Sequence, residues 1–240
     1  MMEKKQMIYE GKAKQLYTCD REDAYIMRFK DDATAFNGVK KAQITNKGTL
    51  NNQISTILFH QLHRHGIPTH YIETLNDREQ LCYKVQIFPL EVIVRNIIAG
   101  SMAKRLDIEE GTPSAKPIYE LCYKNDELGD PLINEDHAMA LGFITEEELR
   151  TVKRLTLSIN RLLIDLFDRI GITLVDFKIE FGKLPDGTVI LADEISPDSC
   201  RLWDKQTGKK LDKDRFRRDL GNVEDAYQEI FNRLSEVYHD

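Results

Sequence analysis

The segment from Leu174 to Glu194 constrains the fold more than any other part of the sequence. In its first half, apolar residues at 175, 177, 179 and 181 alternate with Asp176, Lys178 and Glu180. Because successive side chains of a β-strand point to opposite faces, this pattern predicts a strand with one apolar and one charged face. The turn signal Pro-Asp-Gly at 185–187 and a second strand-like run, TVILADE, follow. An Asp-Gly pair between two such runs favours an antiparallel β-hairpin.

If Asp186 and Gly187 alone form the turn, Glu180 lies directly opposite Asp193. Like charges in that arrangement are destabilising, so the repulsion must be offset. A shared proton, a lysine such as Lys178, or a divalent cation would each offset it. Mg²⁺ is commonly held by one or two carboxylates together with substrate phosphates, and it is the cation we expect here. The simpler alternative is an exposed hairpin with ordinary surface charges, because the register can slip and the turn can be longer.

Two further clusters predict anion binding. Lys12 and Lys14 follow Gly11 two residues apart, so both ammonium groups would lie on one face and could meet a polyphosphate. The alternative is an exposed basic hairpin, since no Walker or dinucleotide glycine motif is present. Arg95 ends a hydrophobic run, and Ser101 lies near the predicted N-cap of a helix. A guanidinium beside such a helix start can form an anion pocket, although a serine that simply caps the helix is the alternative.

The composition excludes several classes of protein. The chain of 240 residues has 34 Lys and Arg against 40 Asp and Glu, and a net charge of -6 argues against a dedicated nucleic-acid-binding protein. No apolar run is long enough to span a membrane or to act as a signal peptide. The four cysteines lack metal-ligand or disulfide-framework spacing, which is typical of reduced thiols in a cytoplasmic protein.

The remaining pattern predicts an ordered mixture of strands and helices. We expect a domain boundary at residues 87–89, which divides the chain into an N-terminal β-rich domain, 1–87, and a C-terminal domain, 88–240. Turn-forming residues predict a long loop over 111–142. Thr145 and Glu148 form a capping-box signal. The predicted strands are 6–10, 14–19, 24–30, 70–75 and 81–88, and the predicted helices are 49–65, 145–170 and a last one from 222.

Three blocks of this sequence resemble the SAICAR synthetases of purine biosynthesis. They are YEGKAK near the N-terminus, FPLEVIVRNIIAGS in the middle, and LVDFKIEFG followed by LADEISPDSCRLWDK. The KND and GDP segments at 124–131 and DKDRFRRDLG near the end are also similar to that family. The resemblance covers nearly the whole chain and departs at no charged position of these blocks.

The resemblance implies an ATP-dependent ligase. It would join the carboxylate of 5-amino-1-(5-phosphoribosyl)imidazole-4-carboxylate to the amine of L-aspartate, with release of ADP and phosphate. A carboxylate is a poor acyl donor, so ATP would first convert it into an acyl phosphate. The rival interpretations are a small-molecule phosphotransferase and a non-catalytic nucleotide-binding module that uses the same charged residues.

The resemblance also implies roles for individual residues. Glu180 and Asp193 would hold Mg²⁺ on the nucleotide phosphates, with Asp193 also counted among the catalytic residues. Lys178 would stabilise charge, and Asp176 would be either a structural partner or a helper in deprotonating the amine. The cofactor-binding residues would be Lys12, Ala13 and Lys14 at the phosphates and Lys84, Val85, Gln86 and Ile87 at the adenine. The substrate-binding residues for the imidazole nucleotide would be Arg95, Ser101, Asp198 and Arg201.

The fold implied by the resemblance is α+β and two-lobed. A small antiparallel N-terminal sheet domain would lie over a larger domain with a central antiparallel sheet flanked by helices, with ATP in the cleft between them. The implied partners are the three small-molecule substrates, with no nucleic acid and no membrane, and the implied assembly is a homodimer.

Overall fold

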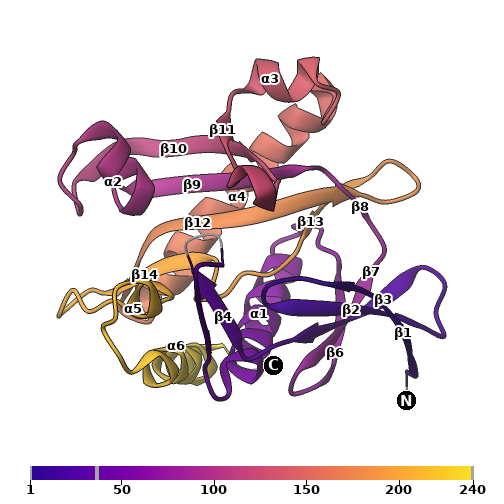
Figure 1. Ribbon diagram of the computed structural model, residues 1–240, viewed down its shortest axis with the longest axis horizontal. Coiled ribbons are helices and arrows are strands. Elements are labelled where there is room, and N and C mark those ends of the chain that lie inside the picture. Colours follow the sequence, from indigo (N-terminus) through magenta and orange to yellow (C-terminus); the bar gives the residue numbers. More distant parts are fainter. Residues whose placement is uncertain (1, 36–37, 239–240) are drawn as a thin grey trace.

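The N-terminal part of the chain forms an antiparallel sheet of five strands (Figure 1). The computed structural model describes residues 2–35 and 38–238. In spatial order the strands are β1 (Lys4–Glu10), β2 (Lys14–Cys19), β3 (Ala24–Phe29), β7 (Glu79–Tyr83) and β6 (Tyr71–Asn76). Aromatic and β-branched residues favour strands here, and the predicted strands at 6–10, 14–19, 24–30 and 70–75 are confirmed. The predicted strand at 81–88 is wrong as a single strand, because the chain leaves the first sheet after Tyr83. A ribbon of β4 (Asp32–Ala35) and β5 (Lys40–Gln43) follows β3.

The second sheet is built around the long strand β12 (Ile172–Lys183), which pairs with four other strands. All of its pairings are antiparallel, and together the two sheets confirm the predicted α+β class. The other strands are β8 (Gln86–Ile87), β9 (Leu90–Ile97), β10 (Pro113–Tyr123), β11 (Leu132–Ile133), β13 (Val189–Ala192) and β14 (Cys200–Asp204). The charged face of β12 thus lies at the middle of the sheet.

The prediction of a long loop over 111–142 is wrong. This segment contains β10, a short 3₁₀ helix, Asp126–Leu128, strand β11 and helix α3 (Glu135–Ala140). Strand β10 pairs with β9 along its length, except for an irregularity between Pro113 and Ile118. Pro117 lies in that irregular stretch, where its missing N–H removes no ladder hydrogen bond. The pairing with β9 therefore overrides the local turn signals.

The predicted register of the hairpin is wrong by one residue. Glu180 lies opposite Ala192, not opposite Asp193. The connection has three residues instead of two, because the N–H of Leu184 donates to the carbonyl of Thr188 at 2.9 Å. Gly187 has a φ of 87°, the left-handed conformation that a three-residue hairpin loop requires at this position. The extra loop residue shifts every pair by one.

Three long helices bury the sheets. α1 (Lys47–Arg64) packs on α6 (Val223–Val237), and α4 (Glu146–Arg169) packs on β12 (Figure 1). The capping box of Thr145 and Glu148 is present at the start of α4. One hydrophobic core cluster contains side chains from all three helices and from β9 and β12. Two short helices, α2 (Gly100–Leu106) and α5 (Asp214–Arg217), follow β9 and β14 in the chain. Within the described ranges, the helices are too short or too polar to cross a membrane.

Candidate active site

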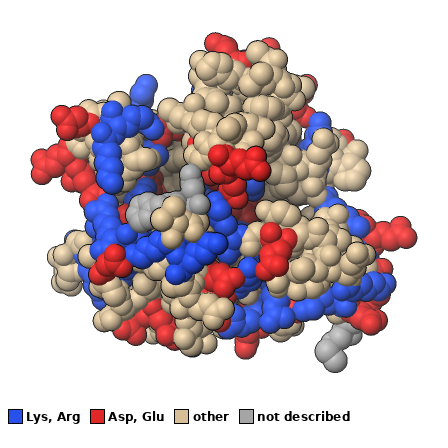
Figure 2. All heavy atoms as spheres, viewed as in Figure 1, with Lys and Arg blue, Asp and Glu red and all other residues tan. Residues whose placement is uncertain are grey.

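Residues from both sheets line a cleft made of two connected cavities. Basic and acidic side chains lie next to each other across the middle of this face of the molecule (Figure 2). One cavity, of about 310 Å³, is strongly charged, and the other, of about 320 Å³, is mostly apolar. The two share five lining residues: Tyr9, Lys14, Lys124, Glu180 and Asp193. The cleft therefore offers an apolar space that opens onto a charged one.

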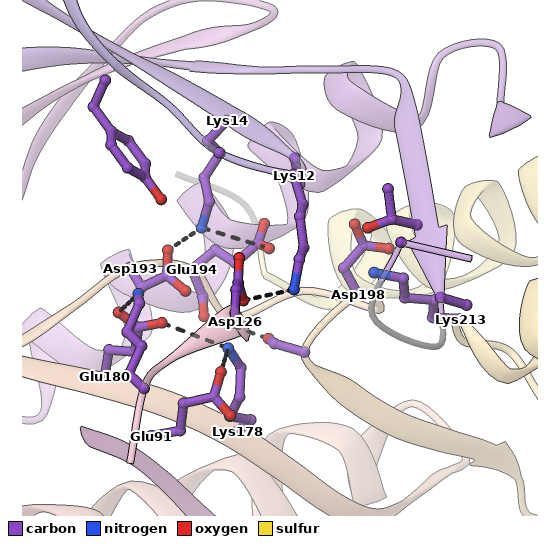
Figure 3. A pocket seen from close by; sticks show the side chains of 18 of the residues that line it. Lys12, Lys14, Glu91, Asp126, Lys178, Glu180, Asp193, Glu194, Asp198 and Lys213 are labelled. Atoms are coloured by element: carbon purple, nitrogen blue, oxygen red, sulfur yellow. Dashed lines mark hydrogen bonds and ion pairs between the residues drawn. The ribbon is translucent and has the colours of Figure 1, made fainter. Parts of the chain in front are cut away.

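Lys14 joins the two sheets at the point where the cavities meet. It is the first residue of β2, and its ammonium contacts the carboxylate of Asp193 and lies 3.6 Å from Oε1 of Glu194 (Figure 3). Asp193 directly follows β13 and has a φ of 63°, so the strand ends there and the chain turns. Although burial disfavours both charges, their attraction raises the pKa of Lys14 and lowers the pKa of Asp193. This pair is an ion pair in a desolvated site.

Glu194 is a carboxylate with an unused oxygen. Its side chain is 6% exposed, and its Oε2 has no hydrogen-bond partner among the described residues. Burial raises the pKa of Glu194, and the neighbouring charge of Asp193 acts in the same direction. The charged cavity thus contains an oxygen atom that is free to accept a hydrogen bond or a cation.

Lysines compensate the charge of Glu180. The Glu180 carboxylate contacts Lys124 and lies 3.5 Å from Nζ of Lys178, which in turn donates to Glu91 at 2.7 Å. Despite burial, Glu180, Glu91 and Asp193 together raise the pKa of Lys178. A shared proton, a lysine or a divalent cation could offset the charge of two neighbouring carboxylates. Among the described residues, lysines offset it. Glu180 and Asp193 nevertheless line the same two cavities, and their role as metal ligands stays a prediction.

Lys12 and Ala13 also line the charged cavity. Lys12 lies just before β2, and its Nζ donates to Oδ1 of Asp126 at 2.7 Å. The backbone carbonyl of Ala13 accepts from the N–H of Lys30 at 2.8 Å, which fixes the turn between β1 and β2. Lys12 and Lys14 therefore both reach the charged cavity, as their spacing predicted.

A third cavity, of about 180 Å³, lies beside the charged one. Arg95, Ser101, Asp176 and Arg201 are among its lining residues. Oδ2 of Asp176 accepts from Arg95 at 2.9 Å and from Arg201 at 2.8 Å. Arg95 also donates to Oγ of Ser101 at 3.3 Å. Because Asp176 is occupied by two guanidinium groups, its position fits a structural partner of the arginines better than a proton acceptor.

Helix α2 starts two residues earlier than expected, at Gly100, so Ser101 lies inside its first turn and does not cap it. Gly100 has a φ of 57°, and a Cβ at this residue would lie 2.3 Å from Nη2 of Arg201. Only glycine permits this close approach. Gly100 therefore makes room for the arginine that lines the third cavity.

Asp198 lies where the charged and third cavities meet. Its carboxylate forms an ion pair with Lys47 at the start of α1 and accepts from the hydroxyl of Tyr227 at 2.7 Å. Lys47 is almost fully buried, and its charge helps to lower the pKa of Asp198 against the effect of burial. This pair ties α1 and α6 to the edge of the site.

Comparisons with known proteins identify the family. The SAICAR synthetase family profile matches residues 7–234. The chain belongs to the SAICAR synthetase family. It is 63% identical over 235 residues to the phosphoribosylaminoimidazole-succinocarboxamide synthase of Fusobacterium nucleatum, covering 98% of this chain and 99% of that one. A synthase of Clostridium botulinum is also 63% identical, over 98% of this chain and 100% of the relative.

Solved structures agree with this assignment. The crystal structure of the synthase from Ehrlichia chaffeensis superposes with a TM-score of 0.95 at 49% identity, over 98% of this chain and 100% of that one. A SAICAR synthetase in complex with ADP superposes with a TM-score of 0.92 at 50% identity, over 97% and 99% of the two chains. The chain is accordingly an ATP-dependent ligase of purine biosynthesis, with the imidazole carboxylate ribonucleotide and L-aspartate as substrates, and the predicted activity is confirmed.

The segment predicted to contact adenine faces two directions in this SAICAR synthetase family member. Val85 and Ile87 line the apolar cavity, together with Leu16, Tyr25, Met27 and others. Lys84 and Gln86 instead line a separate depression beside Lys183. This alternation follows from the extended backbone at β8. Of the four side chains, the structure therefore brings only Val85 and Ile87 to the apolar cavity.

Several residues of the site carried no local signal in the sequence. Lys124, Glu91, Glu194 and Lys47 were not among the predicted site residues, yet the first three line the charged cavity and Lys47 holds Asp198. Glu91 lies an even number of residues from Arg95 on β9, so the two side chains belong to the same face of the strand, and Glu194 directly follows Asp193. Those positions were weak indications that Glu91 and Glu194 belong to the site. Lys124 begins the KND segment that resembles the family, whereas Lys47 reaches the site only through tertiary packing.

Proposed function

We propose that ATP binds with its base in the apolar cavity and its phosphates in the charged one. The apolar cavity supplies a mostly hydrophobic lining, and such a lining with a few polar groups suits a purine base. Lys14 and Lys124 line both cavities, and Lys12 lines the charged one, so the phosphates would pass between ammonium groups. Val85 and Ile87 would contact the base, while Lys84 and Gln86 would contribute through their backbone.

Glu180 and Asp193 fit a Mg²⁺ ion bound to those phosphates. Within the described ranges, no three His, Cys, Asp or Glu side chains are grouped as ligands of a metal ion, so the protein alone does not enclose a cation. Two carboxylates that face one cavity, with the free oxygen of Glu194 beside them, match the few protein ligands that Mg²⁺ takes when phosphates complete its shell. When bound, Mg²⁺ would neutralise charge on the phosphates. Lys14, Lys124 and Lys178 would then exchange their carboxylate partners for phosphate oxygens.

The imidazole nucleotide would occupy the third cavity. Arg95, Ser101 and Arg201 would bind its 5'-phosphate, because a pair of guanidinium groups and a hydroxyl is well suited to a phosphate. Asp176 would hold both arginines in place. Asp198, at the junction of the two cavities, would lie near the ribose or imidazole.

The reacting groups would meet at the junction of the charged and third cavities. A carboxylate oxygen of the imidazole nucleotide would attack the γ-phosphorus, the bond to the leaving ADP oxygen would break, and an acyl phosphate would form. The amine of L-aspartate would then attack the acyl carbon, and the bond from that carbon to the phosphate oxygen would break. The extra protons of the nitrogen would pass to the released phosphate and to water. Lys178 lines both the charged and the third cavity. It would stabilise the negative charge that builds up on the transferred phosphoryl group.

The observation that carries this proposal is the sharing of lining residues. Lys14, Glu180 and Asp193 belong to both the apolar and the charged cavity, and Lys178 and Asp198 to both the charged and the third. A coupled assay of ADP release tests it. The ligase should turn over only with both the imidazole carboxylate and L-aspartate, and turnover should require Mg²⁺. ADP release with a single acceptor and a stable phosphate ester as product would instead identify a phosphotransferase.

We further propose the domain boundary at 87–89, a cytoplasmic location and a homodimer. The boundary is supported by the change from the first sheet to the second between β7 and β9, although α1 packs into the core of the second part. The four cysteines are free and buried, which fits a reducing compartment. Light scattering coupled to gel filtration would measure the assembly state.

A further inference from the structure

The carboxylate of Asp198 is held by buried side chains of two helices. The hydroxyl of Tyr227 on α6 donates to Oδ1 at 2.7 Å, and Nζ of Lys47, the first residue of α1, lies 2.5 Å from Oδ2. The side chains of Lys47 and Asp198 are 1% and 3% exposed, and Tyr227 is equally buried. Asp198 nevertheless lines both the charged and the third cavity. A carboxylate at the junction of the two cavities is therefore fixed from inside the fold, through both of its oxygens.

The ring of Tyr227 belongs to the hydrophobic core, whereas its hydroxyl belongs to the site. Tyr227 shares the buried face of α6 with Ala226, Ile230 and Leu234, and all four are members of the main core cluster. A phenylalanine ring fills the same space, so packing in the core does not account for the hydroxyl. The hydrogen bond to Asp198 is what the tyrosine adds.

Both groups are in the protonation state that this hydrogen bond needs. Burial raises the pKa of Tyr227, and the charge of Asp198 raises it further, so the hydroxyl stays a donor. Burial opposes ionisation of Asp198, but the charges of Lys47 and Lys213 and the hydroxyl of Tyr227 lower its pKa. The ionised carboxylate can only accept hydrogen bonds.

An ion pair alone does not fix the plane of an aspartate carboxylate, because the last torsion angle of this side chain has a broad distribution. A second partner on the other oxygen fixes that plane, and with it the direction of the lone pairs that are left for a ligand. The imidazole nucleotide offers donors to such a carboxylate, namely its ribose hydroxyls and the amino group of its ring. We propose that Tyr227 is a positioning residue of the ligation, whose hydroxyl orients Asp198 for a hydrogen bond from the imidazole nucleotide. This inference rests on the proposed placement of that nucleotide in the third cavity.

Steady-state kinetics of the full-length Tyr227→Phe variant test this role. The KM for the imidazole nucleotide should rise about tenfold, because Asp198 keeps its charge and its ion pair but loses its fixed orientation. The KM values for ATP and for L-aspartate should change less than about twofold. Tyr238→Phe is the matched control and should behave as the wild type. Tyr238 directly follows α6, and its hydroxyl donates at 3.1 Å to the carbonyl of Leu166, outside all three cavities.

A merely structural role of Tyr227 would give a different result. Loss of stability would lower kcat through the fraction of folded enzyme and would leave all KM values unchanged. An unchanged KM for the imidazole nucleotide, or an equal rise in the KM of all three substrates, would overturn the proposal. Calorimetric titration of the variant makes the same comparison without turnover: the Kd for the imidazole nucleotide should rise about tenfold, and the Kd for ADP should stay within about twofold of the wild type.

The Arg95→Ala variant separates failure of this inference from failure of the proposed function. Arg95 lines the third cavity, whereas Tyr227 acts on that cavity only through Asp198. If Arg95→Ala raises the KM for the imidazole nucleotide and Tyr227→Phe does not, the positioning role alone is wrong. If neither variant raises it, the placement of the nucleotide in the third cavity is wrong as well.

Discussion

Lys14 and Asp193 connect the two sheets at the point where the apolar and charged cavities meet. The lysine begins β2, and the carboxylate follows β13, 179 residues later in the chain. Both side chains are mostly buried, with exposed fractions of 14% and 20%. The ion pair bridges the two sheets, and both of its members line the two cavities in which the nucleotide and its cation are proposed to bind.

Replacement of Asp193 by Asn should abolish Mg²⁺-dependent turnover without unfolding the protein. The change removes one of two proposed metal ligands and the partner of Lys14, so kcat/KM should fall by at least about 100-fold. Asp186→Asn at the exposed tip of the same hairpin is the control and should retain activity. Turnover should be measured across a Mg²⁺ titration, with circular dichroism to confirm the fold. Near-normal activity of the Asp193 variant would remove this residue from the metal site.

Replacement of Arg95 by Ala should affect the imidazole nucleotide far more than ATP. Arg95 is 4% exposed, and its removal takes one cationic partner from each of two buried carboxylates, Asp176, which keeps Arg201, and Glu120, which keeps Arg105. We expect a rise of at least about tenfold in the KM for the imidazole nucleotide and a smaller free energy of unfolding, because each buried carboxylate loses one of its two partners. Arg105→Ala is the control, since Arg105 also contacts Glu120 but is 38% exposed and does not line the third cavity. Equal changes in KM for both nucleotides would place Arg95 in the ATP site.

Local sequence patterns correctly predicted those helices and strands that depend on residues close together in the sequence. The capping box at Thr145 fixed the start of α4, and alternation of residues fixed the two faces of β12. The hairpin register was missed by one because a two-residue and a three-residue loop both place Asp-Gly at the tip, and only the hydrogen bonds of Leu184 tell them apart. Strand β10 was missed because turn-forming residues are frequent in the segment 111–142. The strand that pairs with it, β9, lies outside that segment.

The same distinction applies to the site. Lys12, Lys14, Glu180 and Asp193 came from short charged motifs, and all four line the charged cavity. Lys47 lies in a stretch without such a motif, and Lys124 begins the KND segment but was given no role there. Both depend on partners more than 50 residues away, Asp198 and Glu180. Burial of Lys47 in particular follows from the packing of α1 against the rest of the fold, which no local pattern encodes.

Replacement of Gly100 by Ala should displace Arg201. A Cβ at this position would lie 2.3 Å from Nη2 of Arg201, so the guanidinium must move away from Asp176. The KM for the imidazole nucleotide should rise about tenfold if that guanidinium binds its phosphate. Gly208→Ala is a matched control, because Gly208 has a φ of 68° but nothing within 4 Å of its Cβ position. Similar kinetics of the two variants would show that backbone strain, and not the contact with Arg201, explains any loss.

Replacement of His70 by Phe should remove part of the acid sensitivity of the fold. His70 is buried, neither ring nitrogen has a partner among the described residues, and burial lowers its pKa from 6.5 to about 4. Between those two values the unfolded chain binds a proton that the folded chain does not, so the free energy of unfolding falls as the pH falls from 6.5 toward 4. At pH 5 this amounts to roughly 2 kcal/mol relative to pH 8.

Phe cannot bind the proton and leaves no buried nitrogen unpaired. Urea unfolding at pH 8 and pH 5 should therefore show a smaller loss for the variant than for the wild type, and an equal loss in both proteins would mean that His70 is protonated in the folded state.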